Sequence, residues 1–118
     1  MEAVSKTIRE LQREVHRTAL EHGWWNDFGP GAAPKLAKLA LIHSEISEAV
    51  EEVRDGTLHL RYPPDGSGKP EGMVVELADA VIRIMDLCEA LGLDLQDAIE
   101  VKHEYNKTRA YRHGGKRA

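Results

Sequence analysis

Apolar residues recur every three or four positions along four stretches of the chain, which is the spacing of amphipathic helices. This spacing predicts helices from about Ser5 to His22, from near Pro34 to Asp55–Gly56, from about Glu71 to Leu91, and from an N-cap at Asp94 to about Arg109. Runs of β-branched residues at alternating spacing are absent, and only 5% of the residues are aromatic. We therefore expect an all-α fold, a bundle of four main helices.

The second and third of these helices are the most apolar. One side of the second helix carries Leu39, Ile42, Ile46, Val50 and Val53. The third is apolar around most of its circumference, which is typical of a buried helix. We expect both helices to contribute to the core, and we expect the irregular connection between them, residues 57–71, to act as a lid or a subunit contact.

Length, charge and cysteine content narrow the class of protein. A chain of 118 residues is long enough for one domain with one core, so we expect a single domain over residues 1–118. The single cysteine, Cys88, has no partner for an intramolecular disulfide, and no run approaches the ~20 apolar residues of a membrane span. With a formal net charge of −4, the chain also lacks the basic character of a nucleic-acid-binding protein. We expect a cytoplasmic protein with neither a membrane nor a nucleic-acid partner.

Polar residues form an unexpected stripe on the apolar third helix. At roughly 100° per residue, Glu76, Asp79, Arg83 and Asp86 fall on one narrow face. Removing an ionised carboxylate from water costs on the order of several kcal/mol unless a cation compensates. We interpret Arg83 and Asp86 as an ion pair one turn apart, which leaves Glu76 and Asp79 in need of a cation.

The second helix offers a matching acidic pair. Glu45 and Glu48 share one face of that helix, and the i, i+3 spacing places their side chains one above the other. Glu52 continues the face, where we expect a supporting or surface role. Facing Glu76 and Asp79, this pair would form an all-oxygen cage suited to Mg²⁺ or Mn²⁺ rather than to zinc.

The fourth helix has basic and amide residues where apolar ones are expected. Its apolar stripe continues into Lys102, Asn106 and Arg109. Cations and an amide group donate hydrogen bonds to phosphate oxygens. This end of the helix is therefore a candidate polyphosphate-binding surface.

Taken together, these motifs resemble the MazG-type all-α nucleoside triphosphate pyrophosphohydrolases. The resemblance rests on Glu45-Ile-Ser-Glu48, Glu76-Leu-Ala-Asp79 and the spacing of Lys102, Asn106 and Arg109, and it covers about Leu36 to Lys116. It implies a bundle completed by homodimerisation, often as a dimer of dimers. It also implies that the four carboxylates bind Mg²⁺, with Mn²⁺ as a possible substitute, and activate water for attack at the α-phosphorus. The products would be a nucleoside monophosphate and pyrophosphate, and the role would be nucleotide-pool housekeeping.

The resemblance also implies a set of substrate-binding residues. Those expected to contact phosphate are Lys102, Asn106 and Arg109, followed by Tyr111, His113 and Lys116. In the region expected to recognise the base, the sequence matches the family pattern only loosely. There Trp24 and Trp25 are candidates either for stacking on the base or for a hydrophobic plug between helices. The histidines at 16, 22, 43 and 59 are read as incidental.

Other functions fit part of the pattern. A phosphoribosyl-ATP pyrophosphatase would share the acidic pairs, whereas a dimeric dUTPase fits a short chain with one set of pairs less well. A di-iron bundle requires Glu-x-x-His on two helices, and we find it once on an expected helix, as Glu100-Val-Lys-His103. A non-catalytic, metal-binding helical dimer remains the alternative outside the enzymes.

Overall fold

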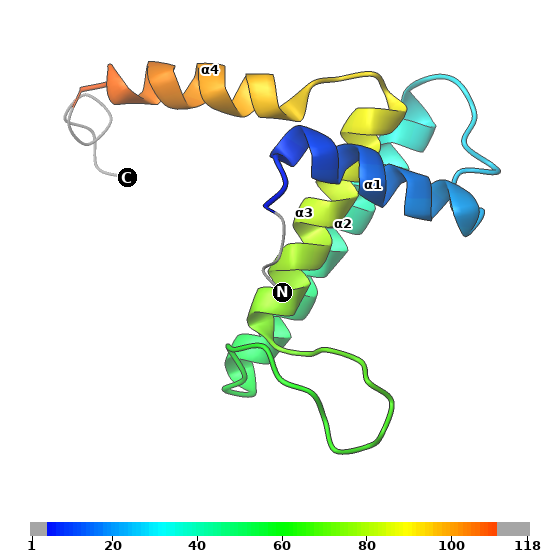
Figure 1. The fold of residues 1–118 in the computed structure, drawn as a ribbon, viewed down its shortest axis with the longest axis vertical. Helices are drawn as coiled ribbons and strands as arrows, with labels where there is room; N and C mark the ends of the chain where they lie inside the picture. The colour runs from blue at the N-terminus through cyan, green and yellow to red at the C-terminus, as the bar shows by residue number, and fades with distance from the viewer. Residues whose placement is uncertain (1–4, 111–118) are drawn as a thin grey trace.

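The computed structural model describes residues 5–110 and consists of four helices joined by loops (Figure 1). The helices are α1 (Ile8–Glu21), α2 (Ala32–Arg54), α3 (Met73–Ala90) and α4 (Leu95–Lys107). Within the described range, the only strand-like pairing is an isolated antiparallel bridge between Arg61 and Glu71. The prediction of an all-α fold is confirmed. No helix of residues 5–110 is long and apolar enough to cross a membrane.

Local capping sets where the helices begin. Thr7 caps α1, because its hydroxyl accepts the Glu10 N–H at 3.1 Å and the Glu10 carboxylate accepts the Thr7 N–H at 3.2 Å. This capping box starts the helix later than Ser5, where the apolar spacing alone had placed it. Asp94 caps α4 as predicted, by accepting the Asp97 N–H at 3.1 Å.

Helices α2 and α3 form an antiparallel pair, and α1 crosses α3 at the end of the pair away from the 57–72 connection (Figure 1). Three buried alanines, Ala19, Ala49 and Ala80, lie one on each of these helices. Small side chains allow helix backbones to approach closely. Gln12 is also buried, and its amide donates to Glu89 at 2.9 Å and to the Leu93 carbonyl at 2.8 Å, which ties α1 to the end of α3.

Helix α4 projects away from the α2–α3 pair (Figure 1). It packs mainly against α1, and none of its residues is buried. Its first turn is held by Arg9, whose guanidinium donates to Asp94 at 2.8 Å and whose backbone N–H donates to Gln96 at 3.0 Å. The radius of gyration is 17.2 Å, compared with about 13 Å for a compact domain of roughly this length.

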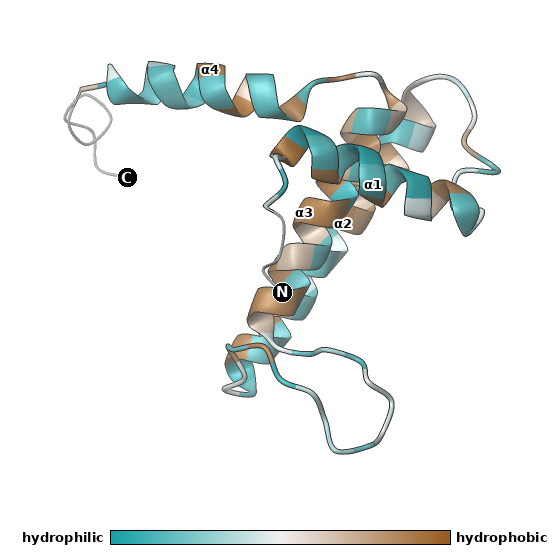
Figure 2. Ribbon diagram, viewed as in Figure 1, coloured by the Kyte–Doolittle hydropathy of each residue, from teal (hydrophilic) through white to brown (hydrophobic). Residues whose placement is uncertain are grey.

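The prediction that the apolar side of α2 lies in the core is wrong for the single chain. Val50 and Val53 are 46% and 53% exposed, and Leu39 and Ile46 are exposed as well. Val81 on α3 is 50% exposed, and Figure 2 shows apolar positions along the part of α3 that α1 does not cover. The reason is geometric: three helices in contact cover only part of each apolar circumference. An extensive apolar surface of α2 and α3 is therefore left uncovered.

The 57–72 connection closes tightly onto the start of α3. The Thr57 and Leu58 carbonyls accept the Met73 and Val74 N–H groups at 2.8 and 3.1 Å. At the closure, Gly72 adopts φ +124°, and a Cβ built there would lie 2.2 Å from the His59 carbonyl oxygen. Only glycine fits this position. The prediction that the connection acts as a lid or a subunit contact stays a prediction.

The Gly72→Ala variant is expected to lose about 2–3 kcal/mol of unfolding free energy, because it combines backbone strain with a backbone clash. Gly68→Ala is the matched control. Gly68 also has positive φ, +71°, but a Cβ there meets nothing within 4 Å, so its loss should stay near 1 kcal/mol. Urea unfolding of both variants at one protein concentration measures the difference. Equal losses would show that the close approach to His59 carries no cost.

Candidate metal centre and adjoining cavity

Three carboxylates from the facing helices α2 and α3 meet at one point. Glu45 comes from α2, and Glu76 and Asp79 come from α3, where the three-residue spacing places both on one face. One oxygen from each residue lies within 4.8 Å of the others. Three of the four predicted metal ligands are therefore brought together by the fold.

The electrostatics of this cluster disfavour its ionised form. Burial, followed by the charges of Asp79 and Glu45, raises the pKa of Glu76. Burial and then the charge of Glu45 also raise the pKa of Asp79, although Arg83 opposes this shift. Within residues 5–110, no Lys, Arg or His forms a direct ion pair with Glu76 or Asp79. A divalent cation would relieve the repulsion.

Glu48 is not part of the group of three. It lies one turn beyond Glu45 on α2 and is exposed, yet its charge also raises the pKa of Glu76. Glu52, on the following turn, does the same and accepts a hydrogen bond from the Thr57 hydroxyl. The acidic face of α2 thus continues past the cluster of three carboxylates, and Glu48 lies at the edge of that cluster.

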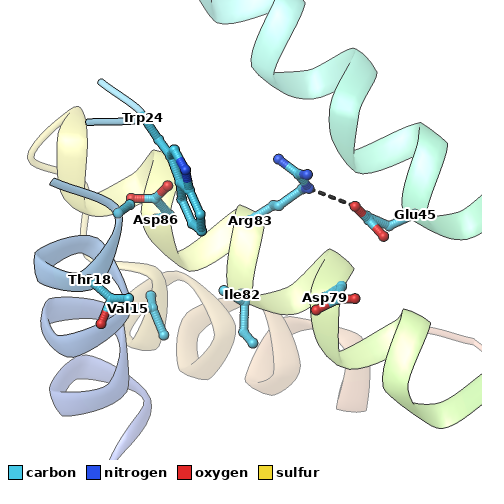
Figure 3. A pocket seen from close by; sticks show the side chains of 9 residues that line it. Val15, Thr18, Trp24, Glu45, Asp79, Ile82, Arg83 and Asp86 are labelled. Carbon is cyan, nitrogen blue, oxygen red and sulfur yellow. Dashed lines mark hydrogen bonds and ion pairs between the residues drawn. The ribbon is translucent and has the colours of Figure 1, made fainter. Parts of the chain in front are cut away.

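Arg83 pairs across helices instead of along its own. Its Nε donates to Glu45 at 2.8 Å, so the expected ion pair between Arg83 and Asp86 is wrong. The long side chain reaches α2 because the two helices lie side by side at this level (Figure 3). A cation that binds Glu45 must therefore compete with this guanidinium.

Asp86 instead binds two groups from the N-terminal part of the chain. The His16 ring N–H at Nδ1 donates to Asp86 Oδ1 at 2.7 Å, and Trp25 Nε1–H donates to Oδ1 and Oδ2 at 3.0 and 3.1 Å. His16, which was read as incidental, therefore has a defined structural partner in Asp86. The sequence contains a signal for this contact, because Gln12 and His16 follow Ile8 at four-residue intervals and so fall on its side of the helix.

The two tryptophans differ in environment. The Trp25 ring packs edge-on against Phe28 and His16, and the Lys38 ammonium lies 4.1 Å from its centroid. Trp25 therefore fills space between helices, as one of the two interpretations expected. Trp24 is 62% exposed, its ring lies 5.3 Å from that of His22, and it stands at the edge of a cavity.

A cavity of about 380 Å³ adjoins the carboxylates. Glu45 and Asp79 lie at one end, whereas Trp24, Thr18 and Asp86 lie at the other (Figure 3). Its volume is within the range of small-molecule sites. The candidate metal centre and a ligand-sized cavity are thus continuous.

The α4 candidates lie elsewhere in the single chain. Lys102 and Asn106 line a separate, open hollow on α4, and the Lys102 ammonium lies 4.8 Å from the centroid of the Tyr105 ring. Arg109 follows the helix and is exposed. Because α4 projects away from α2 and α3, the fold of one chain does not bring these residues to the carboxylates (Figure 1). Residues Tyr111, His113 and Lys116 lie outside the described residues.

No protein-family model, curated protein or solved structure matches this chain significantly.

Proposed function

We propose that this chain is a metal-dependent nucleoside triphosphate pyrophosphohydrolase that releases a nucleoside monophosphate and pyrophosphate. One observation carries the proposal: three carboxylates from facing helices converge, with the pKa of Glu76 and of Asp79 raised, at one end of a cavity of about 380 Å³. The motif resemblance to MazG-type enzymes supports the same activity. A triphosphate would lie at the carboxylates and its nucleoside in the cavity.

The donor set fits a hard divalent cation. All three groups offer oxygen, and Mg²⁺ prefers one or two carboxylates together with water and phosphate oxygens. Glu45, Glu76 and Asp79 would hold Mg²⁺ or Mn²⁺, and Glu48 would join them or orient the attacking water. When bound, the ion supplies charge neutralisation for the triphosphate and acidifies the attacking water.

Other residues would position the substrate. Arg83 lies between the carboxylates and the end of the cavity lined by Trp24 and Asp86. Its guanidinium would therefore turn to a phosphate oxygen once a cation binds Glu45. The exposed Trp24 ring offers a stacking face for the base. The Trp25 ring, packed between helices, would support that end of the cavity.

Homodimerisation would complete the site. The apolar residues of α2 and α3 that one chain leaves exposed require a cover, and a second copy would supply it. The projecting α4 would then reach across, bringing Lys102, Asn106 and Arg109 to the phosphates bound by the partner. This arrangement explains why phosphate-binding residues lie apart from the carboxylates within one chain.

Introducing a charge into this surface is expected to separate the subunits. Val81→Asp would bury an unpaired carboxylate in the interface and should weaken self-association at least about 100-fold. Ser47→Asp, on the charged face of α2, is the control and should leave the assembly unchanged. Light scattering across a concentration series measures both. A wild-type chain that is monomeric at all concentrations would contradict the dimer.

The activity itself is tested by measuring pyrophosphate release from ribo- and deoxyribonucleoside triphosphates with Mg²⁺, with Mn²⁺ and with chelator. Metal-dependent formation of monophosphate plus pyrophosphate is the expected result. If no triphosphate is cleaved, phosphoribosyl-ATP is the next substrate to test. Failure there as well would favour a metal-binding dimer without catalytic function.

A further inference from the structure

Asp86 lies at the far end of the cavity from the candidate metal centre. It follows Asp79 by seven residues on α3, which amounts to nearly two full helical turns, so both carboxylates share one face about 10 Å apart along the axis. Both line the same cavity (Figure 3). A nucleotide whose phosphates lie at Asp79 would therefore extend its base toward Asp86. This inference rests on the proposed function.

The Asp86 carboxylate is held in a fixed orientation. His16 and Trp25 both donate to it, from α1 and from the loop after α1, and its side chain is only 15% exposed. Oδ1 accepts the two shorter bonds, whereas Oδ2 accepts only the longer Trp25 contact, at 3.1 Å. A carboxylate has about four acceptor positions and no hydrogen to donate when ionised. Oδ2 therefore keeps acceptor capacity at the cavity wall.

The other side chains at this end of the cavity contribute one hydroxyl oxygen, an apolar wall and a single donor, the indole N–H of Trp24. The Thr18 hydroxyl donates to the Glu14 carbonyl at 3.2 Å, which leaves its oxygen as an acceptor. Val15, Ala19 and Ile82 contribute apolar wall. Arg83 is engaged by Glu45 toward the metal end. A ligand group that binds at Asp86 must therefore donate a hydrogen bond, because the carboxylate only accepts.

We propose that Asp86, positioned by His16 and Trp25, binds the exocyclic amino group of the nucleobase, so that the enzyme selects amino-bearing bases. Cytosine and adenine present such a group. Uracil and hypoxanthine carry a carbonyl oxygen in the same place, and that oxygen would face the carboxylate without a hydrogen bond. A hydrogen bond to a charged acceptor discriminates by about 10- to 100-fold.

The direct test compares nucleotides that differ only in this group, and it uses binding as well as turnover. Titration calorimetry with deoxycytidine and deoxyuridine monophosphates needs neither metal nor catalysis. We expect the cytosine compound to bind about 10- to 100-fold more tightly, and dCTP to exceed dUTP in kcat/KM by a similar factor. The pair dATP and dITP should show the same order. Equal binding of the two monophosphates would overturn the proposal.

Two variants test whether the preference for amino-bearing bases depends on Asp86 and His16. Asp86→Asn presents a donor as well as an acceptor. The ratio of the binding affinities for the cytosine and uracil nucleotides should therefore fall to about one. His16→Gln keeps the Asp86 carboxylate but removes the ring that holds it, and the ratio should fall partway. Circular dichroism checks that both fold. A ratio unchanged in folded Asp86→Asn would overturn the proposal. A binding preference without hydrolysis of any triphosphate would support it while rejecting the proposed reaction.

Discussion

Substitution of Asp79 by Asn is expected to lower triphosphate hydrolysis about 1000-fold or more while the helices remain folded. The amide has nearly the same shape but no charge, so the cluster of Glu45, Glu76 and Asp79 loses a ligand that a divalent cation requires. A metal ion stabilises the transition state by several kcal/mol, and each 1.36 kcal/mol is worth about tenfold in rate. Glu76→Gln should have the same effect. The measurement is pyrophosphate release at saturating Mg²⁺, with circular dichroism as the check on folding.

A matched control comes from the opposite, exposed face of α2. Glu51 pairs with Arg54 at 3.1 Å and does not belong to the cluster, so Glu51→Gln should retain full activity. Glu48→Gln is expected to abolish turnover as well, because that carboxylate would join the ion or orient the water once the site is loaded. Full activity of folded Asp79→Asn would reject the site assignment.

The helices could be predicted from the sequence because their signals are local. Apolar spacing, the Asp94 cap and the glycines after the helices each act within a few residues, and all four helices form within a few residues of their expected bounds. The main error in α1 came from an unrecognised capping box between Thr7 and Glu10. Such a box shifts the start of a helix without changing its apolar stripe.

The cluster of carboxylates was also predictable, at least in part. Glu76 and Asp79 stand out because they interrupt an apolar helix, and Glu45 faces them because α2 and α3 pack antiparallel. The partners of Arg83 and Asp86 could not be derived in the same way. Each is bound by a side chain from another helix or loop, and the spacing along α3 contains no information about those distances.

The exposure of the apolar side of α2 could not be predicted from the sequence, for a different reason. Periodicity identifies which side of a helix avoids water, but it does not say whether the cover comes from the same chain or from a second copy. Val50 and Val53 are apolar residues of the kind found in cores, yet both are about half exposed in the single chain. The same ambiguity affects α4. Its spacing places the basic residues together on one face, but it does not say whether they serve the carboxylates of their own chain or those of a second copy.

Mg²⁺ is expected to raise the melting temperature of the wild-type chain by about 10 °C near neutral pH, and the gain should disappear in acid. The pKa values of Glu76 and Asp79 are raised above their ordinary values of 4.5 and 3.8. The folded chain therefore holds protons more tightly than the unfolded chain. Without metal, stability must fall as the pH rises from the ordinary values through the raised ones. A cation that binds the ionised cluster offsets this loss, by about 2.7 kcal/mol when its concentration is 100 times the dissociation constant.

Thermal unfolding at about pH 4 and about pH 7.5, with Mg²⁺ and with chelator, measures this linkage. The double variant Glu76→Gln/Asp79→Asn has no cluster charge to relieve, so in chelator near neutral pH it should melt above the wild-type chain and should not respond to Mg²⁺. Glu51→Gln should respond as the wild type does, because its carboxylate pairs with Arg54 on the exposed face of α2. A wild-type melting temperature that Mg²⁺ does not move at either pH would mean that the three carboxylates repel one another without binding a cation, and the metal centre would have to be abandoned.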